Sequence, residues 1–181
     1  LGRGSGARSL AGMRRWDPPW LRPLLDVRRS TTRAACEGLE VWDDPHNADP
    51  RFTRVRLRHE VLPLLEDVLA GGVAEALART AEQLREDADA LDAVAAGLIP
   101  DGDELDVAAL ADVPAALRRR VLRAWLTAAG VTGLTDAHLR AADVLAVRGP
   151  DRGGVAVPGG LELFRARGRL GIRPVRWPSA R

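Results

Sequence analysis

Two arginines one helical turn apart are the residues of this sequence best suited to binding an anion. On a straight helix, at about 100° per residue, Arg54 and Arg58 begin a face that aliphatic side chains such as Leu65 continue. A helix exposed to water would place its charges on the opposite face. Because a guanidinium group donates paired hydrogen bonds to oxyanions, we expect these arginines to meet a phosphate, a carboxylate or another domain.

A polar loop precedes the two arginines and is expected to position them. It contains Asp44, Asn47 and Asp49, whose side chains can cap backbone N–H groups or orient a guanidinium group. The helix that follows should run from about residue 51 to residue 69. Pro63 should kink or break it, because proline has no N–H to donate and its ring clashes with the preceding turn.

Other kinds of site chemistry are poorly represented in the sequence. The three histidines are scattered, so we expect no metal site, and no Walker or Rossmann glycine motif is present. The single cysteine, Cys36, cannot form a disulfide within the chain and is expected to be a core thiol. Gly4, Ser5 and Gly6 could present backbone N–H groups to an anion, although their spacing matches neither standard phosphate loop. The chain thus offers recognition groups without an evident nucleophile or base.

The charge distribution suggests an anionic partner. All 27 basic residues are arginine, and the formal net charge of +2 divides into +4 over residues 1–60, −11 over residues 61–112 and +9 over residues 113–181. Basic segments on both sides of an acidic one favour an anion that contacts the two ends. Mutual pairing of the segments after folding explains the pattern equally well. Because there is neither a signal peptide nor an apolar run of roughly 20 residues, we expect a cytoplasmic location and no membrane partner.

The apolar periodicity predicts a mainly helical chain with a small β-rich end. We expect helices at about residues 30–39, 51–69, 73–98, 107–112, 114–129 and 136–148. Residues 20–27 should be extended. From residue 151 onwards the pattern alternates and is interrupted by glycines, which predicts two or three short antiparallel strands. The fold class is therefore mainly α with minor β (α+β).

Two helical segments allow more than one interpretation. Leucines recur every seven residues from Leu77 to Leu98, which could form a dimeric coiled coil, although packing within the same chain is favoured because further helices follow at once. Four arginines between residues 118 and 123 lie beside an apolar stripe. They are either a phosphate-binding ridge or charges that extend over apolar surface into water.

Three segments resemble a known family. The runs RGSGARSLAGM (3–13), RPLLDVRR (22–29) and WDDPHNADPRFTRVRLRHEVLPLLE (42–66) are similar to bacterial isoleucine-tRNA lysidine synthetases, which belong to the N-type ATP-pyrophosphatase superfamily, and VAVPGGLELFRARG (155–168) resembles them more weakly. The resemblance implies a ligase that uses ATP and Mg²⁺ to adenylate the wobble cytidine of an isoleucine tRNA. The amine of L-lysine then displaces AMP, giving lysidine.

The resemblance also implies how this chain is divided. The family's ATP-binding SGGxDS loop is absent, so residues 1–50 would be the incomplete end, or remnant, of an α/β catalytic domain and the chain would be inactive alone, with its catalytic residues unknown. Residues 51–150 would form a helical domain that contacts tRNA, and residues 151–181 a short antiparallel β tail. A homodimer is possible. The competing interpretation is a non-catalytic helical module that binds RNA or protein.

The family motif assigns substrate or tRNA contacts to residues of this sequence. Asp44, Asn47, Asp49, Arg54 and Arg58 would abut the active-site cleft, with the arginines on the tRNA backbone or the triphosphate. The stretch of Gly4, Ser5 and Gly6 would lie on the substrate side. Val55 stands where the family usually has Asn, so this position lacks the amide that could contact a base.

Overall fold

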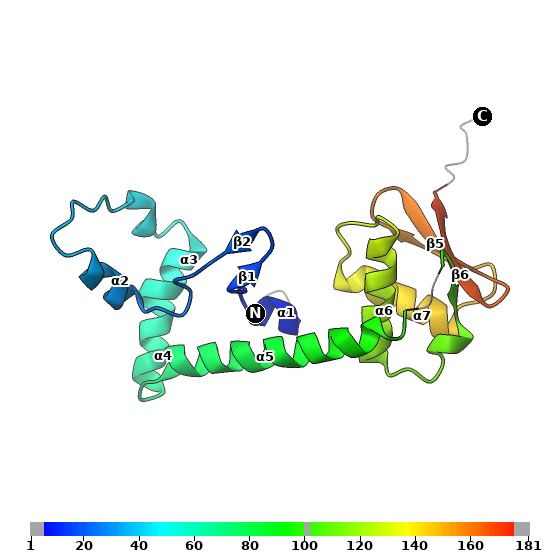
Figure 1. Ribbon diagram of the computed structural model, residues 1–181, viewed down its shortest axis with the longest axis horizontal. Helices are drawn as coiled ribbons and strands as arrows, with labels where there is room; N and C mark the ends of the chain where they lie inside the picture. Colours follow the sequence, from blue (N-terminus) through cyan, green and yellow to red (C-terminus); the bar gives the residue numbers. More distant parts are fainter. Residues whose placement is uncertain (1–5, 100–101, 176–181) are drawn as a thin grey trace. The chain divides into compact units, whose positions relative to one another are not determined.

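The computed structural model describes residues 6–99 and 102–175, and it is an α+β fold in which helices predominate, as predicted (Figure 1). The chain divides into two compact units, residues 1–86 (unit 1) and residues 87–181 (unit 2). The division falls within the long helix α5, Val73–Ala96. The predicted boundaries after residues 50 and 150 stay a prediction.

Unit 1 consists of short elements that lead into α5. In chain order they are α1 Ala7–Leu10, the strands β1 Trp16–Asp17 and β2 Trp20–Leu21, α2 Arg29–Ala35, the 3₁₀ turn η1 Pro45–Asn47, α3 Thr53–Arg56, the π-helical turn η2 Leu57–Val61 and α4 Leu62–Val68. The strands β1 and β2 form an antiparallel hairpin. Because these elements are short, the contacts between their side chains largely hold unit 1 together.

The helix that follows the polar loop is interrupted before Pro63. At η2 the backbone widens, and the N–H of Leu62 donates to the carbonyl of Leu57, five residues earlier. The absent N–H of Pro63 and the clash of its ring with the preceding turn account for this π-turn. The expected disturbance at Pro63 takes the form of a π-turn within one helical run, residues 53–68, rather than a break. Because the π-turn widens the backbone, a straight projection does not hold for the residues after it, such as Leu65, which is exposed. Val55, which precedes the π-turn, is the buried residue of α3.

Unit 1 is fastened to α5 by polar contacts. The carboxylate of Glu66 accepts the backbone N–H groups of Val73 at 3.0 Å and Ala74 at 2.9 Å, which caps the first turn of α5. These N–H groups lower the pKa of the Glu66 carboxyl. Arg28 forms an ion pair with Glu75 at 2.6 Å, and Arg85 donates to the carbonyl of Ala11. Part of the acidic central segment is thus neutralised within unit 1.

Unit 2 packs helices against a small sheet. Its elements after α5 are β3 Leu105–Asp106, the 3₁₀ turn η3 Ala108–Leu110, α6 Ala115–Ala128, α7 Asp136–Arg148, β4 Gly154–Val157, β5 Leu161–Ala166 and β6 Arg169–Pro174. The four strands pair antiparallel in the order β3-β6-β5-β4. The predicted strands at the end of the chain are confirmed, whereas β3 lies in a segment to which the sequence assigned no element.

Apolar side chains from every layer of unit 2 meet in one core. Leu122 and Leu126 of α6, together with Leu163 of β5 and Leu170 of β6, have no exposed surface. Burying a leucine side chain stabilises the fold by roughly 1.5–3 kcal/mol, so this cluster is the main source of order in unit 2. Thr135 caps α7, its hydroxyl accepting the backbone N–H of His138 at 3.3 Å.

A buried ion pair joins the two principal helices of unit 2. Arg118 of α6 donates to the carboxylate of Asp143 on α7 and, at 2.7 Å, to the carbonyl of Val113. Arg118 and Asp143 are each only 12% exposed at the side chain. Nearby, Arg120 pairs with Asp92 at 2.9 Å. Arg119 also lies 3.8 Å from Asp143, and Arg123 donates to the carbonyl of Leu134 at 3.4 Å. All four arginines proposed as a phosphate ridge therefore contact other parts of unit 2.

Candidate functional site

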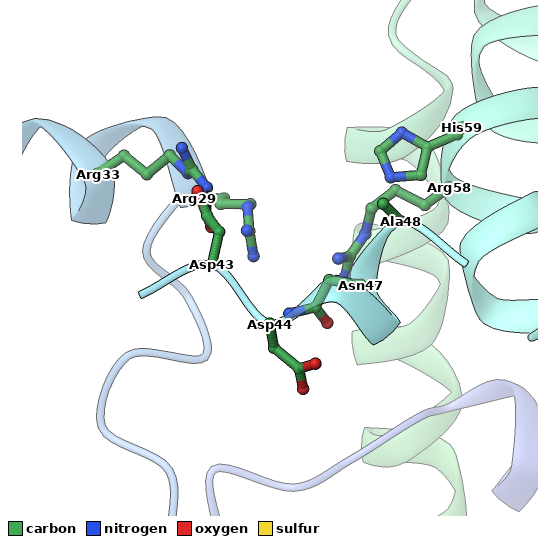
Figure 2. A pocket seen from close by; sticks show the side chains of 8 residues that line it. All are labelled: Arg29, Arg33, Asp43, Asp44, Asn47, Ala48, Arg58 and His59. Atoms are coloured by element: carbon green, nitrogen blue, oxygen red, sulfur yellow. Dashed lines mark hydrogen bonds and ion pairs between the residues drawn. The ribbon is translucent and has the colours of Figure 1, made fainter. Parts of the chain in front are cut away.

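An open pocket in unit 1 gathers several of the residues that the sequence singled out. Its volume is about 440 Å³. Figure 2 shows side chains reaching it from α2, from the loop before α3 and from η2. The lining residues are Arg29, Arg33, Asp43, Asp44, Asn47, Ala48, Arg58 and His59. Of the predicted residues, Asp44, Asn47 and Arg58 are thus brought together.

Asp44 has a structural role in shaping the loop. Its carboxylate accepts the backbone N–H of His46 at 2.9 Å and contacts the Nδ1 atom of the same residue at 2.9 Å. These contacts cap η1 and lower the pKa of the Asp44 carboxyl, the backbone hydrogen bond being the main cause. Asp44 is therefore ionised, and its carboxylate stabilises the turn. This turn holds the next residues of the loop at the pocket.

Asp49 closes the other end of the loop and does not line the pocket. Its carboxylate accepts the backbone N–H of Arg51 at 2.9 Å and forms an ion pair with the Arg51 guanidinium group at 2.7 Å. The hydrogen bonds from Arg51 lower the pKa of Asp49. Since its oxygens already have donors, Asp49 acts as a turn residue that sets where α3 begins.

Arg54 is held by an aromatic side chain beside the pocket. Its Cζ atom lies 5.0 Å from the ring centroid of Phe52, within the range of a cation–π contact. The Phe52 ring in turn meets the ring of His46 edge-to-face at 5.7 Å. Arg54 does not line the pocket, although its charge contributes to the lowered pKa of Asp44. Arg58 thus lines the pocket, whereas Arg54 does not.

Arg58 and Asn47 are the predicted residues left available for a ligand. Within residues 6–99 and 102–175, neither side chain makes a hydrogen bond or an ion pair. In Figure 2 the Arg58 side chain extends towards the loop that carries Asn47. A guanidinium group and an amide are both able to donate to an oxyanion, so together they form the start of an anion site.

Five further lining residues were not assigned by the sequence: Arg29, Arg33, Asp43, Ala48 and His59. Arg33 and Asp43 form an ion pair at 2.5 Å that joins α2 to the loop. Arg29 lies at the first position of α2 and, within the described part of the chain, makes no side-chain hydrogen bond or ion pair. The signal that could have found it is its place in the segment 22–29, which carries the family resemblance.

The remaining predicted residues lie elsewhere or outside the description. Gly4 and Ser5 are outside the described residues. Gly6 has an extended backbone at the start of α1 and does not line the pocket. Val55 is only 6% exposed, which suits an apolar side chain at the position where the family usually has Asn. Its substitution therefore acts on packing in unit 1.

Grouped metal ligands and membrane-spanning helices are both lacking among the described residues. Among them, no group of three or more His, Cys, Asp or Glu side chains is arranged to hold a metal ion. Cys36 is a free, half-buried thiol. No helix within residues 6–99 and 102–175 is both long and apolar enough to cross a membrane.

Comparison with protein families defines the class of each unit. Residues 1–65, which include the pocket, match the PP-loop domain, and residues 105–171 match a family described as the TilS substrate binding domain. The chain therefore combines part of a PP-loop domain with a substrate-binding domain. The first match agrees with the predicted remnant of a catalytic domain, while the second covers most of unit 2.

Individual relatives identify the family more closely. The chain is 62% identical over 166 residues to the tRNA(Ile)-lysidine synthase of Mycobacterium tuberculosis strain H37Rv, an alignment that covers 87% of this chain and 51% of the relative. It is 58% identical over 180 residues to that of Rhodococcus erythropolis, covering 94% and 55%, and 57% identical over 183 residues to that of Nocardia farcinica, covering 96% and 58%. The chain belongs to the tRNA(Ile)-lysidine synthase family, as its motifs predicted, and spans about half the length of these relatives.

Proposed function

We propose that this chain is part of a ligase that uses ATP to attach lysine to the wobble cytidine of an isoleucine tRNA. The observation that carries the proposal is the combination of a PP-loop match over the pocket with identities of 57–62% to tRNA(Ile)-lysidine synthases. The guanidinium and amide groups at the pocket support it, because both ATP and tRNA are polyanions. The complete enzyme would act in the cytoplasm, either alone or as a homodimer.

The residues of this chain would bind and orient the substrates. Arg58 and Asn47 present donors to an oxyanion, while Asp44 and Asp49 shape the loop that carries Asn47. Arg54 keeps its place through Phe52 and would add positive charge beside the site. ATP, when bound, would supply the activating adenylyl group. Carboxylates grouped for Mg²⁺ are lacking among the described residues, so we assign this chain no role in holding the metal.

The division of labour between the segments follows the same proposal. Residues 1–50 would complete the catalytic domain, residues 51–150 would contact tRNA, and residues 151–181 would support them. The match to a substrate-binding domain over residues 105–171 favours tRNA contacts that also reach the sheet of unit 2. Residues 105–171 contain ten arginines and six acidic residues, and the resulting formal net charge of +4 is in keeping with a nucleic-acid partner.

A direct assay tests the proposed function. A full-length synthase that carries residues 1–181 is incubated with isoleucine tRNA, ATP, Mg²⁺ and L-lysine, and the digested nucleosides are analysed by mass spectrometry. We expect lysidine to replace the wobble cytidine, and the product to disappear when ATP or lysine is left out. Stable tRNA binding with no lysidine under any of these conditions would instead identify a non-catalytic RNA-binding module.

A further inference from the structure

We propose that Arg29 and Arg58, with the side-chain amide of Asn47, form a binding site for a single phosphate group in the unit 1 pocket. The inference rests on the proposed function and deepens it by adding Arg29, which lies outside the predicted set of site residues. The two arginines come from separate elements, α2 and η2, and line the same pocket. Figure 2 shows both side chains extending towards the loop that bears Asn47.

Four neighbouring arginines already pair with carboxylates, and Arg54, which contacts the Phe52 ring, does not line the pocket. Arg28 pairs with Glu75 at 2.6 Å and Arg33 with Asp43 at 2.5 Å. Arg51 pairs with Asp49 at 2.7 Å, and Arg56 with Glu60 at 2.9 Å. Hydrogen bonding to these carboxylates raises the pKa of Arg51 and of Arg56. Each of the four arginines thus forms an ion pair with a carboxylate within unit 1.

Arg29 and Arg58 have no such partner within residues 6–99 and 102–175. The acidic residues that line the pocket do not supply one, since Asp43 accepts from Arg33 and Asp44 accepts from His46. The lining side chains include three arginines and two aspartates, a formal net charge of +1 with His59 neutral, and neither Arg29 nor Arg58 pairs with a carboxylate within the described residues. An anion that supplies such a partner is therefore electrostatically favoured.

A phosphate fits this arrangement better than a carboxylate does. Its tetrahedral oxygens can accept from guanidinium groups that approach from two directions, and a further oxygen can accept from the Asn47 amide. A carboxylate has only two oxygens in one plane, which suits a single arginine. The phosphate has two possible sources, the backbone of the tRNA and the triphosphate of ATP.

Binding measurements on the full-length synthase distinguish the two sources. The variants are Arg29→Ala, Arg58→Ala and the double substitution, each with tRNA affinity measured over a range of salt concentrations and ATP affinity measured separately. If a tRNA phosphate occupies the site, each single variant should bind tRNA about tenfold more weakly, and the slope of log K against log[salt] should fall by about 0.7–0.9. ATP affinity should then stay unchanged. If the triphosphate occupies it, affinity for ATP and for inorganic triphosphate should fall about tenfold, with AMP and tRNA binding unaffected.

Matched controls exist next to each arginine in the sequence. Arg28→Ala and Arg56→Ala remove guanidinium groups whose charge is already paired, so they should change neither affinity by more than about twofold. Arg29→Gln and Arg58→Gln keep most of the side-chain length and should repeat the result of the alanine variants. Thermal melting of every variant establishes that the folded protein is being compared.

Three outcomes would overturn the phosphate site. The first is unchanged affinity for tRNA, ATP and triphosphate in the double variant, and the second is an equal loss in the control variants. The third is a selective rise in KM for lysine, which would assign the arginines to the lysine carboxylate. Each of these leaves the proposed function intact as long as the unsubstituted synthase forms lysidine. A synthase that forms none, yet loses tRNA affinity on substitution of Arg29, would refute the function and retain the site.

Discussion

The two units of this chain differ in how they are stabilised. Unit 2 encloses a cluster of fully buried residues, among them Leu122, Leu126 and Leu163. In the described part of unit 1 only Ala11, Val55 and Val73 are buried hydrophobic residues. Large apolar side chains of unit 1 are instead exposed, including Trp42 at 79%, Trp20 at 65% and Leu24 at 62%. Unit 2 therefore has the core of a domain, whereas unit 1 does not.

The two units also differ in whether their charged side chains are buried or exposed. A unit with its own core can place arginines against buried carboxylates, as Arg118 does with Asp143. Unit 1 has mostly exposed ion pairs, and many of its large apolar side chains are exposed as well. Because the chain spans about half the length of its relatives, unit 1 is expected to depend on a surface that the described residues do not provide.

Separating the units is the most severe test of this comparison. A fragment of residues 87–181 should unfold in one cooperative transition, because its core is complete. A fragment of residues 1–86 should show weak or no cooperativity and should bind the dye ANS, because its apolar side chains have nothing to pack against. Circular dichroism melting and ANS fluorescence measure both properties. Equally cooperative melting of the two fragments would contradict the contrast.

Removal of the buried carboxylate should have the largest effect of any single substitution. Asp143→Ala leaves the guanidinium group of Arg118 buried without its partner and should lower the free energy of unfolding of unit 2 by about 3–5 kcal/mol. Asp136→Ala is the matched control, since it removes an exposed pair with Arg140 on the same helix and should change stability little. Chemical denaturation of the 87–181 fragment gives both values. Equal losses would show that burial of the pair is unimportant.

A pair of leucine substitutions compares the units directly. Leu126→Ala removes a side chain with no exposed surface and should destabilise the protein by about 2–5 kcal/mol through lost burial and the cavity left behind. Leu64→Ala in unit 1 removes one that is 60% exposed and should cost much less in this chain. Denaturant unfolding of residues 1–181 carrying each change measures the difference. If Leu64→Ala costs as much, unit 1 has a core that the exposures do not reveal.

The smallest expected effect concerns the cap between α4 and α5. The pKa of Glu66 is lowered in the folded protein, so its contribution to stability is present above the unfolded value, near 4.5, and is lost as the pH falls through the lowered folded value. The amide resonances of Val73 and Ala74 should shift in that acidic range, which NMR titration measures. Glu66→Gln should abolish these shifts while Glu75→Gln, which leaves the cap intact, should retain them. Persistence of the shifts in Glu66→Gln would assign them to another group.

Local patterns in the sequence predicted most of the elements. The limits of the helix at residues 136–148, the disturbance of the helix before Pro63 and the strands after residue 151 all depend on neighbours within a few residues, and each matches its expectation. The strand β3 was missed because its partner, β6, lies more than sixty residues away. A straight projection also cannot anticipate the π-turn, which changes the position of the residues after Val61 relative to Arg54 and Arg58.

By itself the sequence determined the family, the polar loop and the supply of guanidinium groups, because residue types, motifs and short-range spacing are properties of the chain alone. Only the tertiary structure decided which charges are available. Arg33 and Asp43 neutralise each other across ten positions, and Arg28 reaches Glu75 across forty-seven. Pairing of charges depends on distance in space and on burial, neither of which sequence spacing contains. The pairing of Arg28, Arg33, Arg51 and Arg56 with carboxylates in space leaves Arg29 and Arg58 as the pocket-lining arginines without such a partner among the described residues.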